Sequence, residues 1–170
     1  GLGDVYKRQD DIGENDFGDL VSDEFKRPRY EPCELHEEIY KLDSRIVITP
    51  NIDKIYEQYA MTESHSSVVA KSYYEDDIAK YLRTSDYLII RAHGHTDETA
   101  KLVFTQKQYN QARCNYSSFY KLLDALILTH TFIFLGCGIN DPDIKITLEN
   151  SNFLYPGARP HYFVTAEGAY

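Results

Sequence analysis

The sequence predicts a three-layer α/β domain built around a mostly parallel β-sheet. Short apolar runs rich in β-branched residues recur along the chain, and stretches with helical spacing of apolar residues separate them. Strands that alternate with helices form βαβ units with parallel strands. The runs are continuously apolar rather than alternating, which is typical of a sheet covered on both faces.

Size and composition suit one domain. The 170 residues are 42% hydrophobic and 14% aromatic, enough for a sizeable core. The net charge of −9 argues against a general nucleic-acid binder and against binding to an anionic membrane surface, since both need clustered positive charge. We find no apolar run long enough to span a bilayer. Three scattered cysteines without a CxxC pair argue against a disulfide scaffold and fit the cytoplasm.

The first 32 residues differ from the rest of the chain. Residues 4–9 resemble the translation of a transposon-end sequencing adapter, so we expect residues 1–9 to be an artefact. An ordinary flexible N-terminus is the alternative. Residues 10–32 are acidic with few apolar side chains, which predicts a solvated loop or linker. The domain is expected over residues 33–170.

The elements follow from apolar spacing and from turn residues. Strands are predicted at 45–49, 87–92, 131–136 and 161–165. Helices are predicted at 34–42, 53–60, 74–82, 117–128 and 141–150. The clearest helix is 117–128, with a stripe of Phe and Leu side chains. The pair Asp141-Pro142 marks the start of the last helix. The pattern at residues 103–109 is ambiguous and is interpreted as a short strand that runs into a turn.

Small or polar residues follow three of the predicted strands. The first strand is followed by Asn51 and Asp53, the second by His93, and the third by Gly136, Cys137, Gly138 and Asp141. Ligands of open parallel sheets bind beyond the carboxyl ends of the strands, so a binding site is predicted at this edge. Each group also has a plainer interpretation: helix caps for Asn51 and Asp53, a buried histidine for His93, and a simple turn for the glycines.

Two other chemistries are less well supported. His93 and His95 could both bind a metal, but the sequence offers no third ligand at a plausible spacing. Cys137 could be a nucleophile if it lies at a helix N-terminus, but no Cys-His-Asn arrangement is evident.

Three segments taken together resemble the sirtuin-like family, above all its bacterial branch, whose domains hydrolyse NAD in antiphage defence. They are TPNIDKIYEQY (49–59), RAHGH (91–95) and FLGCGINDPDI (134–144). The resemblance covers residues 35–165. It implies a Rossmann-like fold, with NAD as the substrate and no metal. It also implies that Asn51 positions a water or the ribose at the cleaved bond, and that His93 is a general base toward a ribose hydroxyl.

The resemblance implies a nucleotide site as well. Thr49 would line the pocket, and Asp53 would help to order the part that holds the nicotinamide ribose. Gly136 and Gly138 would let the nucleotide approach the backbone, in one segment with Cys137 and Asp141. The chemistry is plausible on its own terms. Nicotinamide leaves an oxocarbenium-like centre as a neutral molecule, so a positioned water and a base near neutral pKa suffice.

The sequence departs from the family in two ways. It lacks the Gly-Ala-Gly-x-Ser phosphate loop that opens the family's domain, so we expect missing N-terminal sequence, and activity of the chain as written stays open. Its three cysteines cannot form the four-cysteine zinc module of deacetylating sirtuins. An NAD glycohydrolase, acting with a fused or partner sensor or as a homo-oligomer, is therefore the first hypothesis. The alternative hypotheses are, in order, a non-catalytic sensor of NAD or ADP-ribose, an assembly domain and a protein deacylase.

Overall fold

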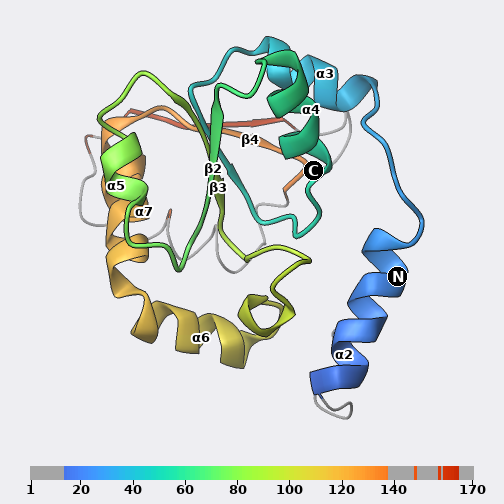
Figure 1. Ribbon diagram of the computed structural model, residues 1–170. Coiled ribbons are helices and arrows are strands. Elements are labelled where there is room, and N and C mark those ends of the chain that lie inside the picture. The colour runs from blue at the N-terminus through green and yellow to red at the C-terminus, as the bar shows by residue number, and fades with distance from the viewer. Residues whose placement is uncertain (1–13, 138–147, 149–156, 158, 165–170) are drawn as a thin grey trace. The chain divides into compact units, whose positions relative to one another are not determined.

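The computed structural model describes residues 14–137, 148, 157 and 159–164 (Figure 1). The chain divides into two units, residues 1–116 and 117–170, which are described one at a time. Within the described residues, no helix is both long and apolar enough to cross a bilayer.

The first unit is built on a three-stranded parallel sheet. Its strands are β1 (Ile46–Thr49), β2 (Val68–Ser72) and β3 (Tyr87–Arg91), in the order β1-β3-β2. Val47 of β1 and Ala70 of β2 both pair with Ile89 of the central strand. The parallel sheet that the apolar runs predict is confirmed.

Helices cover both faces of this sheet. The connection from β1 to β2 passes over β3, and the connection from β2 returns to it, so right-handed crossovers place the two connecting helices on opposite faces. These helices are α4 (Ile55–Glu63) and α5 (Ile78–Tyr81), and Figure 1 shows them on either side of the strands. Helix α3 (Glu34–Lys41) packs on α4, where the Tyr40 and Tyr59 rings meet edge to face with centroids 5.8 Å apart.

Three predictions within this unit need correction. Strand β2 was not predicted, and α5 is shorter than the helix expected over 74–82. The ambiguous segment 103–109 is no strand: it leads into α6 (Gln106–Asn115) after a short 3-10 helix, η2 (Thr99–Lys101). A capping box starts α6, because Thr105 Oγ1 accepts from the Gln108 N–H at 3.2 Å and Gln108 Oε1 accepts from the Thr105 N–H at 3.1 Å.

The acidic segment predicted to be a loop or linker contains helical structure. Helix α2 (Glu14–Val21) continues into a short π-helix, η1 (Ser22–Lys26). Phe17 and Val21 are buried against Ile52 and Leu102, so this segment belongs to the core of the first unit. The loop prediction is therefore wrong for residues 14–26, because two well-placed apolar side chains outweigh many surface carboxylates. Residues 1–13, including the expected artefact, lie outside the described residues.

The described part of the second unit is a helix and a strand pair. Helix α7 (Ser117–Thr129) confirms the clearest helix prediction. Strands β4 (Ile133–Leu135) and β5 (Tyr162–Val164) pair in parallel, and the rings of Phe134 and Phe163 stack with centroids 4.4 Å apart. The helix predicted over 141–150 lies outside the described residues except for Leu148, which is helical.

Candidate functional site

The ends of two neighbouring strands position the two predicted catalytic residues. Thr49, the last residue of β1, pairs with Arg91, the last residue of β3. The Ala92 N–H donates to the Thr49 carbonyl at 2.9 Å, which extends the pairing by one residue. Asn51 and His93 each lie two residues beyond this pair, so they stand on adjacent loops at the carboxyl end of the sheet.

A backbone hydrogen bond joins the two loops, because the Thr96 N–H donates to the Ile52 carbonyl at 3.1 Å. Within the second loop, the Val103 N–H donates to the His93 carbonyl at 3.2 Å. On the first loop, the Asn51 N–H donates to Thr49 Oγ1 at 3.1 Å. Asn51 is exposed, whereas Thr49 and His93 are half-buried. The loops therefore form one hydrogen-bonded platform from which Asn51 is open to solvent.

Asp53 has a clear structural role. Its Oδ1 accepts from the Ile55 N–H at 3.0 Å, which satisfies an otherwise unpaired donor at the start of α4. Lys54 is the N-cap residue of α4 and makes no side-chain cap, so Asp53 supports the helix start from the position before the cap.

Gly94 sets the shape of the second loop. It has φ +80°, and a Cβ at this position would lie 2.8 Å from the Lys101 carbonyl oxygen. Only glycine fits both the left-handed conformation and the close backbone approach. The turn between His93 and His95 is therefore fixed by backbone sterics.

His95 is a structural histidine in a polar network. It is 8% exposed, the Tyr74 hydroxyl lies 3.3 Å from its Nε2, and its Nδ1 accepts from the Asp97 N–H at 3.3 Å. Burial, helped by the charges of Arg91 and Lys54, lowers the pKa of His95 below its usual value. Within the described residues, no group of three or more His, Cys, Asp or Glu side chains is arranged to hold a metal ion.

Asp97 joins this loop to two other segments. Its carboxylate oxygens lie 2.9 Å from the ammonium groups of Lys54 and Lys26. These two hydrogen-bonded ammonium groups lower the pKa of Asp97 to about 2. Since Lys26 belongs to η1 and Lys54 precedes α4, the N-terminal helical segment is tied to both loops of the site.

Sequence reasoning missed a buried charged cluster just below these loops. The Arg91 guanidinium donates to both carboxylate oxygens of Glu57, from Nε at 2.7 Å and from Nη2 at 2.6 Å. Its Nη1 donates to Ser72 Oγ at 3.1 Å. Glu57, Ser72 and Arg91 are all buried. One signal in the sequence could have found the cluster: an arginine ends an apolar strand, and such a charge needs a partner.

The third predicted segment belongs to the second unit. Gly136 is exposed with φ +66°, and the Cys137 thiol donates to the Leu135 carbonyl at 3.2 Å. Gly138 and Asp141 lie outside the described residues. The prediction that this segment meets Asn51 and His93 stays a prediction.

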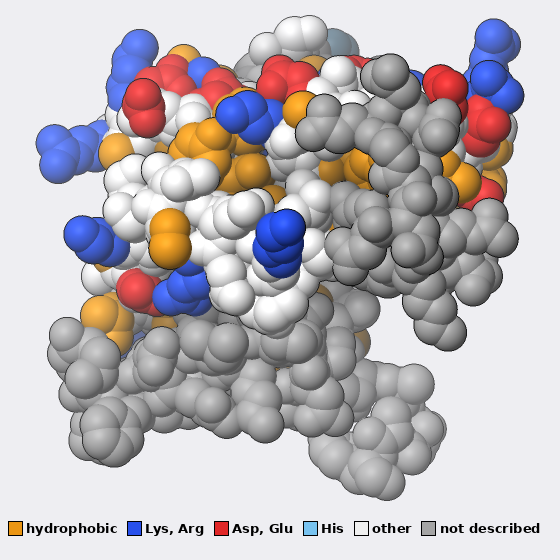
Figure 2. All heavy atoms as spheres, turned by 90° about the horizontal axis from the view of Figure 1, so that it is seen from below, with side chains coloured by type: hydrophobic (Ala, Val, Ile, Leu, Met, Phe, Trp, Pro, Cys, Tyr) orange, Lys and Arg blue, Asp and Glu red, His pale blue; other side chains and the backbone are white. Residues whose placement is uncertain are grey.

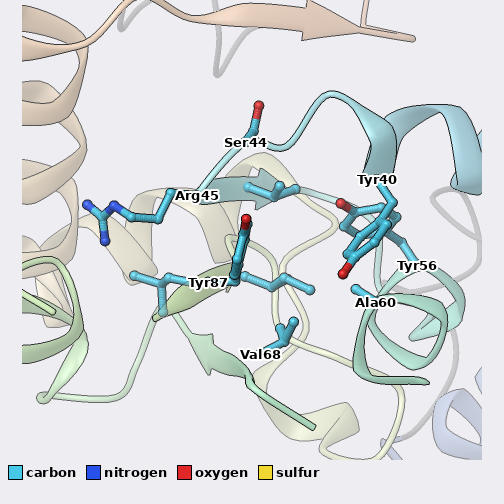
Figure 3. Close-up of a pocket in the computed structure, with 10 residues that line it drawn as sticks. Tyr40, Ser44, Arg45, Tyr56, Ala60, Val68 and Tyr87 are labelled. Atoms are coloured by element: carbon cyan, nitrogen blue, oxygen red, sulfur yellow. The ribbon is translucent and has the colours of Figure 1, made fainter. Parts of the chain in front are cut away.

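A small cavity lies at the opposite end of the sheet. Figure 3 shows its lining, which includes Ser44, Val68 and Tyr87 near the starts of the strands and Tyr40 and Tyr56 from α3 and α4. The Arg45 guanidinium points away from these two rings in the same view. It donates to the backbone carbonyls of Leu82 at 3.2 Å and Thr84 at 3.1 Å. Because Asn51 and His93 follow the carboxyl ends of the strands, this cavity is not the candidate site.

The surface carries charges of both signs. Figure 2 shows the described Lys and Arg side chains on one face separated from one another by other side chains rather than gathered into one patch.

Comparison with known proteins identifies the family. The family described as "SIR2-like domain" matches residues 45–169, from the residue before β1 to near the end of the chain. The chain belongs to the SIR2-like domain family. The matched range includes both site loops, so the resemblance drawn from the three motifs is confirmed, and the parallel α/β fold is that of a Rossmann-like SIR2 domain.

The SIR2-like chain is similar to several curated bacterial proteins. It is 26% identical over 165 residues to the NAD(+) hydrolase ThsA of Enterococcus faecium, covering 96% of this chain and 34% of that protein. It is 22% identical over 160 residues to the NAD(+) hydrolase ThsA of Acinetobacter baumannii (strain 532279), covering 94% of this chain and 33% of that protein. The Defense-associated sirtuin 2 of Bacillus subtilis is 27% identical to this chain over 141 residues, which cover 80% of this chain and 13% of that protein. The chain thus spans about a third of the length of the ThsA relatives.

Proposed function

We propose that the protein carrying this SIR2-like domain is an NAD glycohydrolase of bacterial antiviral defence. The observation that supports it best is the placement of Asn51 and His93 on adjacent, hydrogen-bonded loops at the carboxyl end of the sheet. The relatives named as NAD(+) hydrolases and as a defence-associated sirtuin support the same activity and setting. We further propose that it acts in the bacterial cytoplasm, with residues 33–170 and the packed α2–η1 segment as its NAD-binding domain.

The proposed reaction breaks the bond between ribose C1′ and the nicotinamide nitrogen. Nicotinamide leaves with the bonding electrons as a neutral molecule, water adds its oxygen to C1′, and one proton is released with ADP-ribose. Asn51 orients the water or the ribose through its amide, which does not titrate. His93 takes a proton from a ribose hydroxyl, which stabilises the positive charge that develops at C1′.

The remaining predicted residues are proposed to hold the substrate. Thr49 lines the pocket beside Asn51, and Asp53 acts through its hydrogen bond to the first residue of α4. Gly136, Cys137, Gly138 and Asp141 are proposed to bind the nucleotide through backbone groups. A fused or partner sensor, or assembly into a homo-oligomer, would complete the active protein.

The test is nicotinamide release from NAD by the chain together with any flanking sequence of its parent polypeptide. We expect His93→Ala to abolish release and Asn51→Ala to lower it by about 100-fold or more, as losses of general-base and positioning groups do. His130→Ala, a change at an exposed histidine of the second unit, is the matched control. If both site variants fold and turn over NAD like the parent, the assignment is wrong. If the parent melts at higher temperature with NAD but releases no nicotinamide, the domain is a sensor.

A further inference from the structure

We infer that the buried ion pair between Glu57 and Arg91 is a positioning device for the proposed reaction, holding the Asn51 and His93 loops in register with each other. This inference rests on the proposed function and extends it to two residues that the three motifs leave without a role. Neither side chain is proposed to touch NAD.

The geometry of the pair leaves it little freedom. Both carboxylate oxygens of Glu57 accept from Arg91, at 2.7 and 2.6 Å, and the third guanidinium nitrogen donates to Ser72 Oγ at 3.1 Å. A bidentate contact of this kind fixes the relative orientation of its partners as well as their distance. The guanidinium is thus held by a helix on one side and by a neighbouring strand on the other.

The location of the pair is what gives it a role in the site. Arg91 ends β3, two residues before His93, and Glu57 lies in the first turn of α4, six residues after Asn51. The pair therefore connects the helix that follows the first loop to the strand that precedes the second. Thr49 and Ser72 flank Arg91 in the register of the sheet, so this row is the base from which the loops leave.

Stability alone does not account for a buried pair at this position. Removing two charges from water costs about as much as their attraction returns, and apolar side chains of similar volume often serve as well. The neighbouring row on this face, Val47, Ile89 and Ala70, is apolar and packs under α4. Apolar residues could continue that packing, but they would not impose an orientation on the loops.

The test replaces the pair without leaving a buried charge. In the double variant Glu57→Met with Arg91→Met, we expect the kcat for nicotinamide release to fall about 10- to 100-fold, the scale expected for a small misplacement of reacting groups. The KM for NAD should stay within about twofold, because the binding groups remain. Arg91→Lys, which keeps the charge but loses the bidentate contact, should recover part of the lost rate. Lys71→Met is the matched control, since Lys71 pairs with Glu75 and Asp77 at the same end of the sheet but joins neither loop.

A second measurement is independent of turnover. Hydrogen exchange should quicken at the Thr96 amide, which donates between the loops, and at the Ala92 amide, which donates to the Thr49 carbonyl where the strands end. It should stay slow at the Leu88 amide, which donates to the Arg45 carbonyl at the other end of the sheet. Unchanged kcat and unchanged exchange in the double variant would overturn the inference. So would a loss of rate that only matches a loss of folded protein in a melting curve. A parent protein that never releases nicotinamide would overturn the proposed function, while the exchange measurement would still decide whether the pair holds the loops.

Discussion

His95 is a buried titratable side chain within the site loops, although the proposed chemistry does not use it. The groups around it are Tyr74, Arg91, Lys54, Asp97 and Glu98. Burial and the two cations outweigh the two carboxylates, so its pKa lies below the value of about 6.5 that the unfolded chain has. The folded state therefore holds a neutral imidazole at neutral pH.

This makes stability pH-dependent in a defined direction. Well above pH 6.5 the His95 imidazole is neutral in both the folded and the unfolded state, and its full contribution to stability is present. As the pH falls through 6.5 toward the lower folded pKa, His95 becomes protonated in the unfolded chain but stays neutral in the folded one. Protonation therefore favours the unfolded state, and the free energy of unfolding falls. We expect the melting temperature to fall between about pH 7 and pH 5 and to fall less in His95→Gln. If the melting temperature fell equally with pH in the parent and in His95→Gln, His95 would not be the source of this pH dependence.

The backbone at Gly94 leaves no room for a side chain. Its φ of +80° and the 2.8 Å approach of a Cβ to the Lys101 carbonyl make any side chain costly there. We expect Gly94→Ala to destabilise the protein by about 1–3 kcal/mol, measured by denaturant unfolding. Gly157→Ala, at an exposed glycine where no atom of the described residues lies within 4 Å of the added Cβ, should change stability little. Similar effects of the two changes would mean that the loop tolerates a side chain at Gly94.

Helix α2 contains a residue that weakens it. Gly18 lies inside it, where glycine costs about 1 kcal/mol relative to alanine. A Cβ at Gly18 would meet Thr99 Oγ1 at 3.6 Å, an ordinary contact. We therefore expect Gly18→Ala to stabilise the first unit by about 0.5–1 kcal/mol, seen as a higher denaturant midpoint with an unchanged slope. A lower midpoint would show that the Thr99 contact is tighter than the structure indicates.

The elements that sequence reasoning missed share a physical cause. Strand β2 carries Lys71 and Ser72, which break an apolar run, yet both side chains find partners in the fold. Helix α6 is polar along most of its length and is held by Tyr109 and Ala112, its two buried side chains. Composition predicts an element well when its apolar face is wide. It fails when a few buried residues and specific polar contacts hold the element instead.

The part of the candidate site that follows directly from the ends of predicted strands could be predicted from the sequence. Two apolar strands, together with the fact that parallel strands end at the same edge of a sheet, were enough to place Asn51 and His93 at one edge. The structure pairs those two strands in parallel. The role of Asp53 at the start of α4 depends on a single hydrogen bond, and that of His95 on burial in the fold, and no sequence pattern shows either. The Glu57–Arg91 pair depends on a contact between a helix and a strand that are far apart along the chain.

The strand order has a consequence for how the first unit folds. The central strand β3 is the last of the three to emerge along the chain, and it pairs with both others. The chain between Val69 and Leu88 is less than half as long as that between Ile46 and Leu88, so pairing of β2 with β3 closes the smaller loop and loses less chain entropy. We therefore expect β1, with the Asn51 loop, to dock last and to be the first of the three strands released on unfolding.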